Sequence, residues 1–301
     1  MTERVSPRVA VVGVAGKWST ECLADALEKR TGFRLVVDAT RTTLDLKSGS
    51  LWYAGQNLCE LDGMVIKKVS STYSTDTIER LELLRFAEAS GVRCFGPIPA
   101  MQTLVDRLRC TLALHTGGIP LPETTITEQL EQAITAVNQY GEAILKPLFS
   151  SKARGMRVLS ADMGTTELIQ QIADFKADNP VLYVQKKYDL AGEDYGLVFL
   201  GDRYLCAYAR KGAKDAWNTT INSGGHYSAY HPPEDIIALA DKARSLFGLD
   251  YTTVDIAITS EGPCVFEVSA FGGFRGVKTG AGLDAAELYA AYILNKLGDS
   301  A

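Results

Sequence analysis

Short apolar runs and amphipathic segments alternate along roughly the first hundred residues of the chain. The apolar runs are rich in β-branched residues and have the length of buried strands, which predicts strands at 8–14, 33–39, 61–69 and 93–97. The segments ECLADALEKRTG (21–32) and 76–92 carry apolar positions at helical spacing and reach a glycine near their ends. Strands that alternate with helices predict a parallel, Rossmann-like sheet over residues 1–96.

The pattern changes at GPIPA (96–100), where two prolines break the periodicity and mark a boundary. Residues 105–118 then have the pattern of a helix that ends in glycines. A helix–strand alternation follows and ends in the strand AILKPLF (143–149). We therefore expect a second structural unit over residues 97–185.

From about residue 181 the strand-like runs follow one another as hairpins. Gly201-Asp202 and Glu261-Gly262-Pro263 are suited to short hairpin connections. One helix is expected between the strands, at 233–246, and another at 284–296. The predicted fold class is thus α/β plus α+β, with antiparallel sheet in a third unit over residues 186–301.

Composition and charge exclude several classes of protein. The net charge is −5 with acidic and basic residues interleaved, so we expect no nucleic-acid partner. No run of about 18 apolar residues indicates a membrane span, and MTERVSPRVAVVGVAG (1–16) lacks the pattern of a signal peptide. The 6 cysteines are scattered without a CxxC pair, which fits neither a zinc site nor a disulfide framework. We expect reduced thiols and a cytoplasmic protein.

The segment GVAGKWST (13–20) is similar to a phosphate-binding loop but lacks its spacing. Val11 stands where a P-loop needs its first glycine, and Trp18 takes the place of the hydroxyl residue after the lysine. The three glycines of the dinucleotide-binding fingerprint are also missing. We interpret the segment as a tight strand-to-helix turn. The alternative is a substrate contact at the helix N-terminus, where free N–H groups favour anions.

Lys146 follows a predicted strand and precedes a loop of small residues that contains Ser150, Ser151 and Gly155. A lysine is a point charge suited to phosphate oxygens, and the N–H groups of a loop can wrap a polyphosphate. The segment is therefore a candidate phosphate site. An ordinary surface hairpin is the alternative interpretation.

Asp255 and Glu267 lie in the strand-like runs TTVDIAI and CVFEVSA, which a turn joins. A hairpin can place such residues on neighbouring strands and on one face, because side-chain direction alternates along a strand. Magnesium prefers oxygen ligands and usually takes one or two carboxylates together with substrate phosphates. The pair is therefore a candidate magnesium site. The alternative is a buried salt bridge to Arg210 or Lys211.

The 3 histidines, His115, His226 and His231, have neither the spacing of metal ligands nor a neighbouring nucleophile. We expect surface or supporting roles for His115 and His231. His226 follows Gly224-Gly225 and is a candidate for lining a site.

Taken in order, motifs between residues 101 and 288 resemble the ATP-grasp superfamily, in particular its RimK-like branch of carboxylate–amine ligases. Asp106-Arg107 resembles the Asp-Lys that opens a helix there, and Leu145-Lys146-Pro147 with SSKARGM resembles the strand and glycine-rich lid. The remaining matches run from the hinge to the closing segment: Val184-Gln185-Lys186-Lys187, Gly192-Glu193-Asp194, Arg210-Lys211, Gly224-Gly225, Val254-Asp255-Ile256, Phe266-Glu267-Val268-Ser269 and EVSAFGGFRGVKTGAGLDAA. Among less characterised groups, the chain resembles the ATP-grasp proteins of GAK systems.

The resemblance implies an ATP-grasp fold with an N-terminal Rossmann-like (pre-ATP-grasp) domain and ATP between two α+β units. The implied activity is an ADP-forming ligase that makes an amide or peptide-like bond through an acyl phosphate, with an amino acid such as glutamate among its substrates. The implied metal is Mg²⁺, or Mn²⁺ in its place, held by Asp255, Glu267 and Ser269. The implied catalytic residues are Arg210 and Lys211. The implied ATP contacts are Arg107, Lys146, Ser150, Ser151, Gly155, Gln185, Lys186, Lys187 and Asp194.

The partners implied are a small-molecule carboxylate and an amine, or a peptide or protein tail, with no nucleic acid and no membrane. A homo-oligomer, dimer or tetramer, is expected because closed symmetric assemblies are common among soluble enzymes.

Four positions depart from the family pattern. Ser269 and Thr220 stand where asparagines are usual, Lys186 replaces the acid of the hinge, and Gly196 replaces an arginine. Serine is a weaker oxygen donor for a metal, and arginine is not readily replaced in carboxylate recognition. One alternative to an active ligase is a catalytically impaired ATP-binding or regulatory protein of the same fold. A nicotinamide-dependent dehydrogenase is another, and only the N-terminal α/β pattern favours it.

Overall fold

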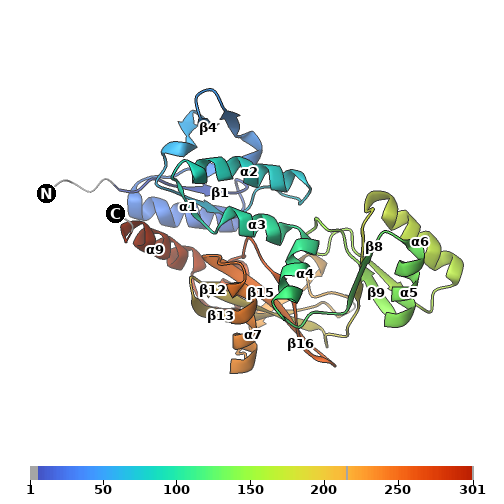
Figure 1. Ribbon diagram of the computed structural model, residues 1–301. Helices are drawn as coiled ribbons and strands as arrows, with labels where there is room; N and C mark the ends of the chain where they lie inside the picture. The colour runs from blue at the N-terminus through green and yellow to red at the C-terminus, as the bar shows by residue number, and fades with distance from the viewer. Residues whose placement is uncertain (1–5, 215, 300–301) are drawn as a thin grey trace.

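The N-terminal part contains the predicted parallel sheet (Figure 1). The computed structural model describes residues 6–214 and 216–299 and orders this sheet β2-β1-β6-β7. Its strands are parallel throughout and comprise β1 (Val9–Val12), β2 (Val36–Val37), β6 (Gly63–Ile66) and β7 (Arg93–Phe95). The strand predicted at 33–39 is only two residues long, because Asp38 accepts the N–H of Thr40 and starts a 3₁₀ turn, η1 (Ala39–Arg41).

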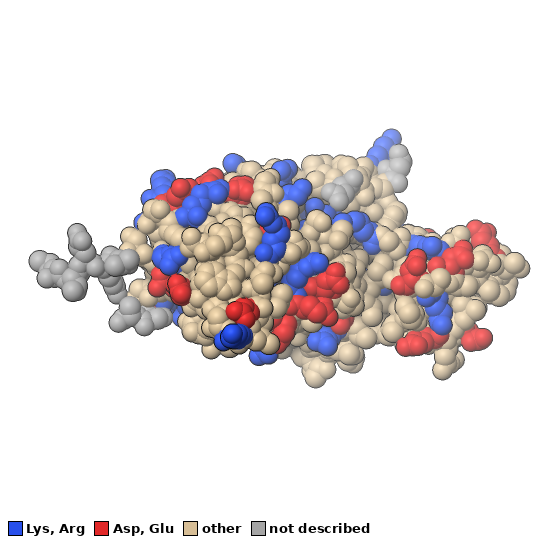
Figure 2. All heavy atoms as spheres, turned by 90° about the horizontal axis from the view of Figure 1, so that it is seen from above, with Lys and Arg blue, Asp and Glu red and all other residues tan. Residues whose placement is uncertain are grey.

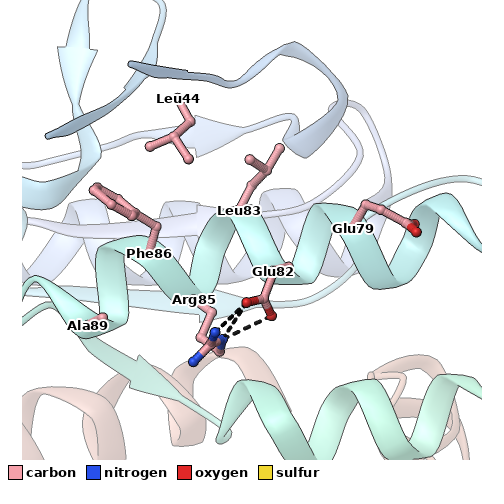
Figure 3. Close-up of a pocket in the computed structure, with 7 residues that line it drawn as sticks. All are labelled: Leu44, Glu79, Glu82, Leu83, Arg85, Phe86 and Ala89. Atoms are coloured by element: carbon pink, nitrogen blue, oxygen red, sulfur yellow. Dashed lines mark hydrogen bonds and ion pairs between the residues drawn. The ribbon is translucent and has the colours of Figure 1, made fainter. Parts of the chain in front are cut away.

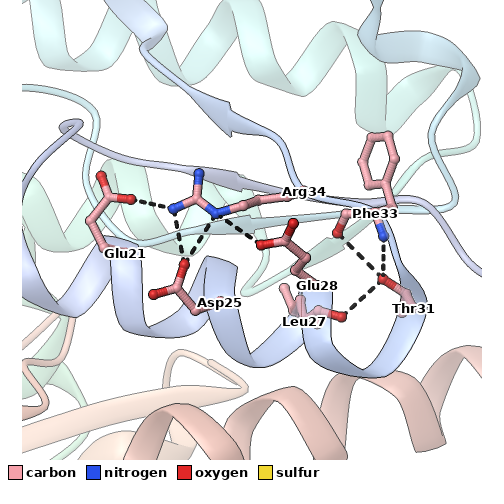
Figure 4. A network of polar contacts seen from close by, with 7 residues as sticks. All are labelled: Glu21, Asp25, Leu27, Glu28, Thr31, Phe33 and Arg34. Atoms are coloured by element: carbon pink, nitrogen blue, oxygen red, sulfur yellow. Dashed lines mark hydrogen bonds and ion pairs between the residues drawn. The ribbon is translucent and has the colours of Figure 1, made fainter.

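Helices α1 (Trp18–Thr31) and α2 (Asp76–Ala89) cover this sheet and confirm the two predicted helices. Gly32 ends α1 in a left-handed conformation (φ 74°), and its N–H donates to the carbonyl of Glu28 at 2.7 Å. Arg34 lies along α1 and forms ion pairs with Glu21 at 2.5 Å, Asp25 at 3.0 Å and Glu28 at 3.3 Å (Figure 4).

A small antiparallel sheet between β2 and β6 was not predicted. It consists of β3 (Thr43–Asp45), β4 (Ser50–Tyr53) and β5 (Gln56–Asn57), followed by the 3₁₀ turn η2 (Leu58–Glu60). Buried Leu51 and Leu58 anchor it to the core. Strands of two to four residues are too short to show a hydrophobic period, and for this reason they were not predicted.

The prolines at 96–100 start a helix, α3 (Ile98–Val105), in place of the expected break. Pro99 stands in the first turn, where its missing N–H leaves no helical hydrogen bond unmade. Helix α4 (Arg107–Thr116) follows as predicted. The carboxylate of Asp106 caps α4 by accepting the N–H groups of Leu108 at 2.9 Å and Arg109 at 3.2 Å.

The central sheet is antiparallel, has the strand order β10-β9-β11-β8, and stands apart on the right of Figure 1. Its elements are β8 (Thr124–Thr127), α5 (Leu130–Tyr140), β9 (Glu142–Leu145), β10 (Arg157–Ser160), α6 (Thr165–Asp178) and β11 (Leu182–Lys186). One core cluster lies wholly within this unit, between Ala133 and Val184. The chain enters and leaves the unit at adjacent points, because the N–H of Lys186 donates to the carbonyl of Glu123 at 2.8 Å.

The C-terminal sheet has the order β14-β13-β12-β15-β16, with antiparallel neighbours, as its hairpin pattern predicts. The strands are β12 (Glu193–Leu200), β13 (Arg203–Lys211), β14 (His226–Ala229), β15 (Tyr251–Thr259) and β16 (Gly262–Val268). The helices are α7 (Glu234–Ser245), α8 (Arg275–Ala281) and α9 (Ala285–Gly298), of which α8 was not predicted. A further 3₁₀ turn, η3 (Ile221–Ser223), precedes β14.

Two core clusters join the N-terminal and C-terminal sheets into one body. One of them contains Met64 and Ile66 of β6 together with Leu197 of β12 and Val254 of β15. Helices α3 and α4 contribute to the same cluster, which ties residues 98–116 to this body. The division at 1–96, 97–185 and 186–301 stays a prediction. Within the described ranges, no helix combines the length and apolar character needed to cross a bilayer.

Candidate functional site

The predicted site residues come from both sides of the junction between the central sheet and the main body. A hollow of about 20 Å³ lies at this junction, which is room for about one water molecule. Polar and charged residues from four segments line it: Tyr73, Arg107, Ser150 and Glu267. Three of them were predicted for the site, and Tyr73 was not.

Lys146 and Arg107 are two cations at this junction. The Nζ of Lys146 is buried and donates to Oε1 of Gln185. Burial and the charge of Arg107 lower the pKa of Lys146 to about 7, against the opposing charge of Glu267. Neither cation forms an ion pair with a carboxylate within residues 6–214 and 216–299. Two neighbouring cations without a paired anion are suited to a polyanionic ligand.

The loop between β9 and β10 contains Ser150, Ser151 and Gly155. The guanidinium of Arg107 donates to the carbonyl of Pro147 at 3.0 Å and to Oγ of Ser150 at 3.1 Å. Gly155 has a positive φ of 70°, and a Cβ there would lie 3.1 Å from the ring of Pro147. The loop is thus held against the start of α4.

The hinge residues have different surroundings. Gln185 is buried, and its amide donates to Thr124 at 3.0 Å. Lys186 forms ion pairs with Glu123 at 2.5 Å and Glu261 at 2.6 Å, and these contacts raise its pKa. Lys187 pairs with Glu142 at 2.9 Å. The ammonium groups of both lysines therefore already have carboxylate partners.

Asp255 and Glu267 are register partners on the adjacent strands β15 and β16, as the period-two pattern predicts. Asp255 Oδ1 is buried and has no hydrogen-bond partner among the described residues. Burial and the charge of Glu267 raise the pKa of Asp255, against the lowering influence of Arg210. A buried carboxylate oxygen without a donor is costly, so this position is suited to a cation.

Arg210 forms the salt bridge that was the alternative interpretation of Asp255, with both side chains largely but not fully buried. Its guanidinium lies 3.0 Å from Asp255 Oδ2 and donates through Nε to Asp194 Oδ1 at 3.1 Å. The charges of the two carboxylates outweigh the effect of burial and raise the pKa of Arg210 well above its ordinary value. The alternative is confirmed for Arg210 but is wrong for Lys211, whose carboxylate partner is Glu193 at 3.6 Å. Because Oδ1 remains free, the salt bridge and a cation site are compatible.

The structure shows the contacts of three of the four positions that depart from the family pattern. Ser269 follows β16, and its N–H donates to the carbonyl of Thr253 at 2.8 Å. A Cβ on Gly196 would lie 2.5 Å from the ring of Tyr208, so a larger side chain does not fit there. Thr220 donates its hydroxyl to Asn218 Oδ1 at 2.8 Å.

Some charged residues near the site were missed by sequence reasoning. Lys67 and Lys68 follow β6, and Arg154 lies in the loop after β9. Lys67 is buried, donates to the carbonyl of Gly272 at 2.5 Å, and stands 3.7 Å from the ring centroid of Phe274. Two lysines directly after a buried strand were the available signal, because the carboxyl edge of a parallel sheet is a common ligand site.

A second hollow lies away from this junction. A larger hollow, of about 480 Å³, lies between α2 and β3 on the outer side of the N-terminal part (Figure 3), with Leu44, Leu83 and Phe86 in its lining. Acidic and basic side chains are interleaved over the face in Figure 2. Within the described ranges, no three His, Cys, Asp or Glu side chains cluster as metal ligands would. The Asp255–Glu267 pair would therefore need further ligands from a substrate.

Comparisons with known proteins agree with the motif order. The family model described as the RimK-like ATP-grasp domain matches residues 104–293. A tetrahydromethanopterin:alpha-L-glutamate ligase of Methanosarcina acetivorans is 24% identical over 93% of this chain and 96% of its own length. A ligase of the same name from Methanococcus maripaludis is 22% identical over 93% of this chain and 95% of its own.

Solved structures show the same fold. The ATP-grasp ligase PsnB, complexed with a minimal precursor, superimposes with a TM-score of 0.75 at 19% identity and covers 97% of this chain and 99% of its own. The D-cycloserine synthetase DcsG superimposes with a TM-score of 0.74 at 16% identity, over 96% of this chain and 99% of its own. The predicted fold class is confirmed. With a family model that matches most of its length, the chain belongs to the RimK-like ATP-grasp family.

Proposed function

We propose that this protein is an ATP- and Mg²⁺-dependent carboxylate–amine ligase that forms an amide or peptide-like bond and releases ADP and phosphate. The observation that carries the proposal is the placement of two unpaired cations, Lys146 and Arg107, beside the cross-strand carboxylates Asp255 and Glu267. Cations suit a polyphosphate, and paired carboxylates suit its counter-ion. Membership of the RimK-like ATP-grasp family supports the same assignment.

The positive charges at the junction suit the phosphates of a nucleoside triphosphate. Lys146 and Arg107 would hold phosphate oxygens, and the N–H groups of the loop that contains Ser150, Ser151 and Gly155 would add donors. Gln185 would lie near the base as part of the hinge. The hollow of about 20 Å³ lies between Arg107, Ser150 and Glu267, where phosphates and a metal ion would meet.

The carboxylates of Asp255 and Glu267 supply the oxygen ligands that a magnesium ion prefers. Asp255 Oδ1 and the carboxylate of Glu267 would supply two oxygen ligands, and the phosphates would supply others. When bound, the metal supplies positive charge that stabilises the phosphates during transfer. The hydroxyl of Ser269 would be a third, weaker protein ligand, and Mn²⁺ has the same preference for oxygen.

The chain's own residues position the reacting groups. In the proposed reaction, a substrate carboxylate oxygen bonds to the γ-phosphorus as the bond to ADP breaks. The amine nitrogen then attacks the acyl carbon and expels phosphate. Arg210, fixed by Asp194 and Asp255, would stabilise negative charge on the acyl phosphate, and Lys211 would assist from the next position of β13.

The relatives named above as alpha-L-glutamate ligases make glutamate the first amine to test. The complex of PsnB with a minimal precursor makes a peptide tail the first alternative acceptor. All 6 cysteines are free thiols, which supports a reducing, cytoplasmic location.

A catalytically impaired ATP-binding protein is the second candidate function. Gly196 has no room for the family's arginine beside Tyr208, and Ser269 replaces an asparagine, so the substrate side of the site differs from the pattern. In that case ATP binds but no acceptor supports turnover.

ADP release in the presence of Mg²⁺, glutamate and a panel of carboxylates tests the proposal. We expect release to depend on both substrates and to fall by about 100-fold or more in Glu267→Gln, because a charge that stabilises the transition state is lost. Glu131→Gln, an exposed substitution on α5, is the matched control and should leave turnover unchanged. ATP binding without ADP release from any substrate pair would favour the impaired protein.

A further inference from the structure

The segment that follows β6 brings Tyr73 to the junction between the central sheet and the main body. Tyr73 lines the hollow of about 20 Å³ together with Arg107, Ser150 and Glu267. The last three residues come from the start of α4, the loop after β9 and strand β16. The N-terminal part of the chain therefore contributes a side chain to the place where the other parts meet.

Hydrogen bonds hold the backbone of this segment. The hydroxyl of Ser70 donates to the carbonyl of Thr72, which closes a short turn. The guanidinium of Arg154, in the loop after β9, donates to the carbonyl of Ser71 at 3.1 Å. The segment is thus tied directly to the loop that would hold the ATP phosphates.

The ring of Tyr73 packs edge-on against Phe271, with ring centroids 6.1 Å apart and an interplanar angle of 71°. Phe271 lies in the connection between β16 and α8, so this contact joins the N-terminal part to the C-terminal sheet. The apolar contact orients the ring without using its hydroxyl, which stays available for a polar partner.

The hydroxyl of Tyr73 forms no hydrogen bond with any residue in the ranges 6–214 and 216–299. Burial and the negative charge of Glu267 raise the pKa of Tyr73, against the opposing charge of Arg154. The hydroxyl therefore keeps its proton at neutral pH and can donate a hydrogen bond. A partly buried donor without a protein partner favours an acceptor that a ligand supplies.

We propose that the Tyr73 hydroxyl donates a hydrogen bond to the terminal phosphate of ATP and so lets the protein distinguish ATP from ADP. This inference rests on the proposed function and adds the N-terminal part to the nucleotide site. In phosphoryl-transfer enzymes the metal bridges the β- and γ-phosphates. Tyr73 shares its hollow with Glu267, the proposed metal ligand, so the terminal phosphate is the acceptor expected there.

Calorimetric titration of the full-length protein in the presence of Mg²⁺ tests the inference, with ADP or with AMPPNP, an ATP analogue that is not hydrolysed. Tyr73→Phe removes the hydroxyl and keeps the ring that packs against Phe271. Tyr204→Phe is the matched control, because Tyr204 lies on β13 outside the hollow. Its ring packs edge-on against Phe199 in a similar way, with centroids 5.8 Å apart and an interplanar angle of 67°.

We expect Tyr73→Phe to bind AMPPNP about tenfold or more weakly than wild type, because a hydrogen bond to a charged group is lost. Its affinity for ADP should stay within about twofold of wild type, which also shows that the variant is folded. Tyr204→Phe should bind both nucleotides as wild type does. An unchanged affinity of Tyr73→Phe for AMPPNP, an equal loss for both nucleotides, or the same loss in Tyr204→Phe would overturn the inference. Absence of AMPPNP binding by wild type would instead contradict the proposed function.

Discussion

The N-terminal and C-terminal sheets differ in how their buried charged groups are neutralised. In the C-terminal sheet, Arg210 lies between Asp194 and Asp255, so its positive charge is matched within the fold. At the edge of the N-terminal sheet, Lys67 is buried against aromatic rings, and burial and the positive charges of Lys152, Arg154 and Lys17 lower the pKa of Lys68. Charges matched inside the protein stabilise the fold, whereas unmatched charges cost stability and are suited to a ligand.

Arg210→Met tests the matched side and has the largest expected effect. It leaves the largely buried carboxylates of Asp194 and Asp255 without a counter-charge, so we expect the free energy of unfolding to fall by about 3 kcal/mol. Urea denaturation measures this change. The control is Arg203→Met, an exposed position on the same strand, which should change stability by less than about 0.5 kcal/mol. Equal effects of the two variants would contradict the comparison.

Lys67→Met tests the unpaired lysine of the N-terminal sheet through the pH dependence of the free energy of unfolding. Burial lowers the pKa of Lys67 to about 7, far below the value in the unfolded chain. Between pH 7 and the unfolded value the unfolded chain binds more protons, so wild-type stability rises with pH by up to about 1.4 kcal/mol per unit. Lys67→Met should show a shallower rise in urea denaturation at about pH 7, 8 and 9. The Lys47→Met control should follow wild type, and parallel curves for all three proteins would refute the assignment.

Gly196→Ala tests how tightly the C-terminal sheet packs beside the ion pairs of Arg210. The added Cβ would lie 2.5 Å from the Tyr208 ring, and a Cβ at Gly276 would lie 2.4 Å from the same ring. We expect a loss of about 1–3 kcal/mol in the free energy of unfolding. Gly164→Ala, where no atom lies within 4 Å of the new Cβ, is the control. In the Tyr208→Leu background, Gly196→Ala should cost less stability than it does in wild type. If the effects of the two substitutions simply add, the Tyr208 ring is not the obstacle.

Lys68→Gln has the smallest expected effect on stability. Removal of one of several like charges should leave the free energy of unfolding unchanged or raise it by up to about 0.5 kcal/mol. Thermal and urea denaturation at low salt would detect this change, because screening weakens the repulsion at high salt. A clear destabilisation would mean that Lys68 supports the fold, and it would remove the contrast with Arg210.

The sequence predicted features that depend on nearby residues. Asp255 and Glu267 were placed together because one hairpin and a period of two suffice for that inference. Their pairing with Arg210 could only be weighed as an alternative, since it requires the order of three strands, β13-β12-β15. Family motifs supplied Lys146, Gln185 and Arg107, whose contacts cross the junction and follow no local pattern.

The contact between Arg154 and Ser71 was beyond sequence reasoning because it joins two distant segments. Residues 67–71 and 151–154 meet only once the central unit lies against the body. The prolines of α3 misled the prediction for a different reason, because the same residue that breaks a helix interior is well suited to a first turn. In both cases the missing information was position in the fold.

The adjacent entry and exit of the central unit, at Glu123 and Lys186, have a mechanical consequence. Two neighbouring connections, clamped by the ion pairs of Lys186, define a single axis of rotation for the unit. Beyond the axis, Ala191 and Gly192 have positive φ angles of 51° and 78°, which places an unusual bend where the chain joins the C-terminal sheet. A small turn about this axis would move the loop of Arg154 by a much larger distance. Opening of the ATP site would then separate the loop of Arg154 from Ser71 in the same motion.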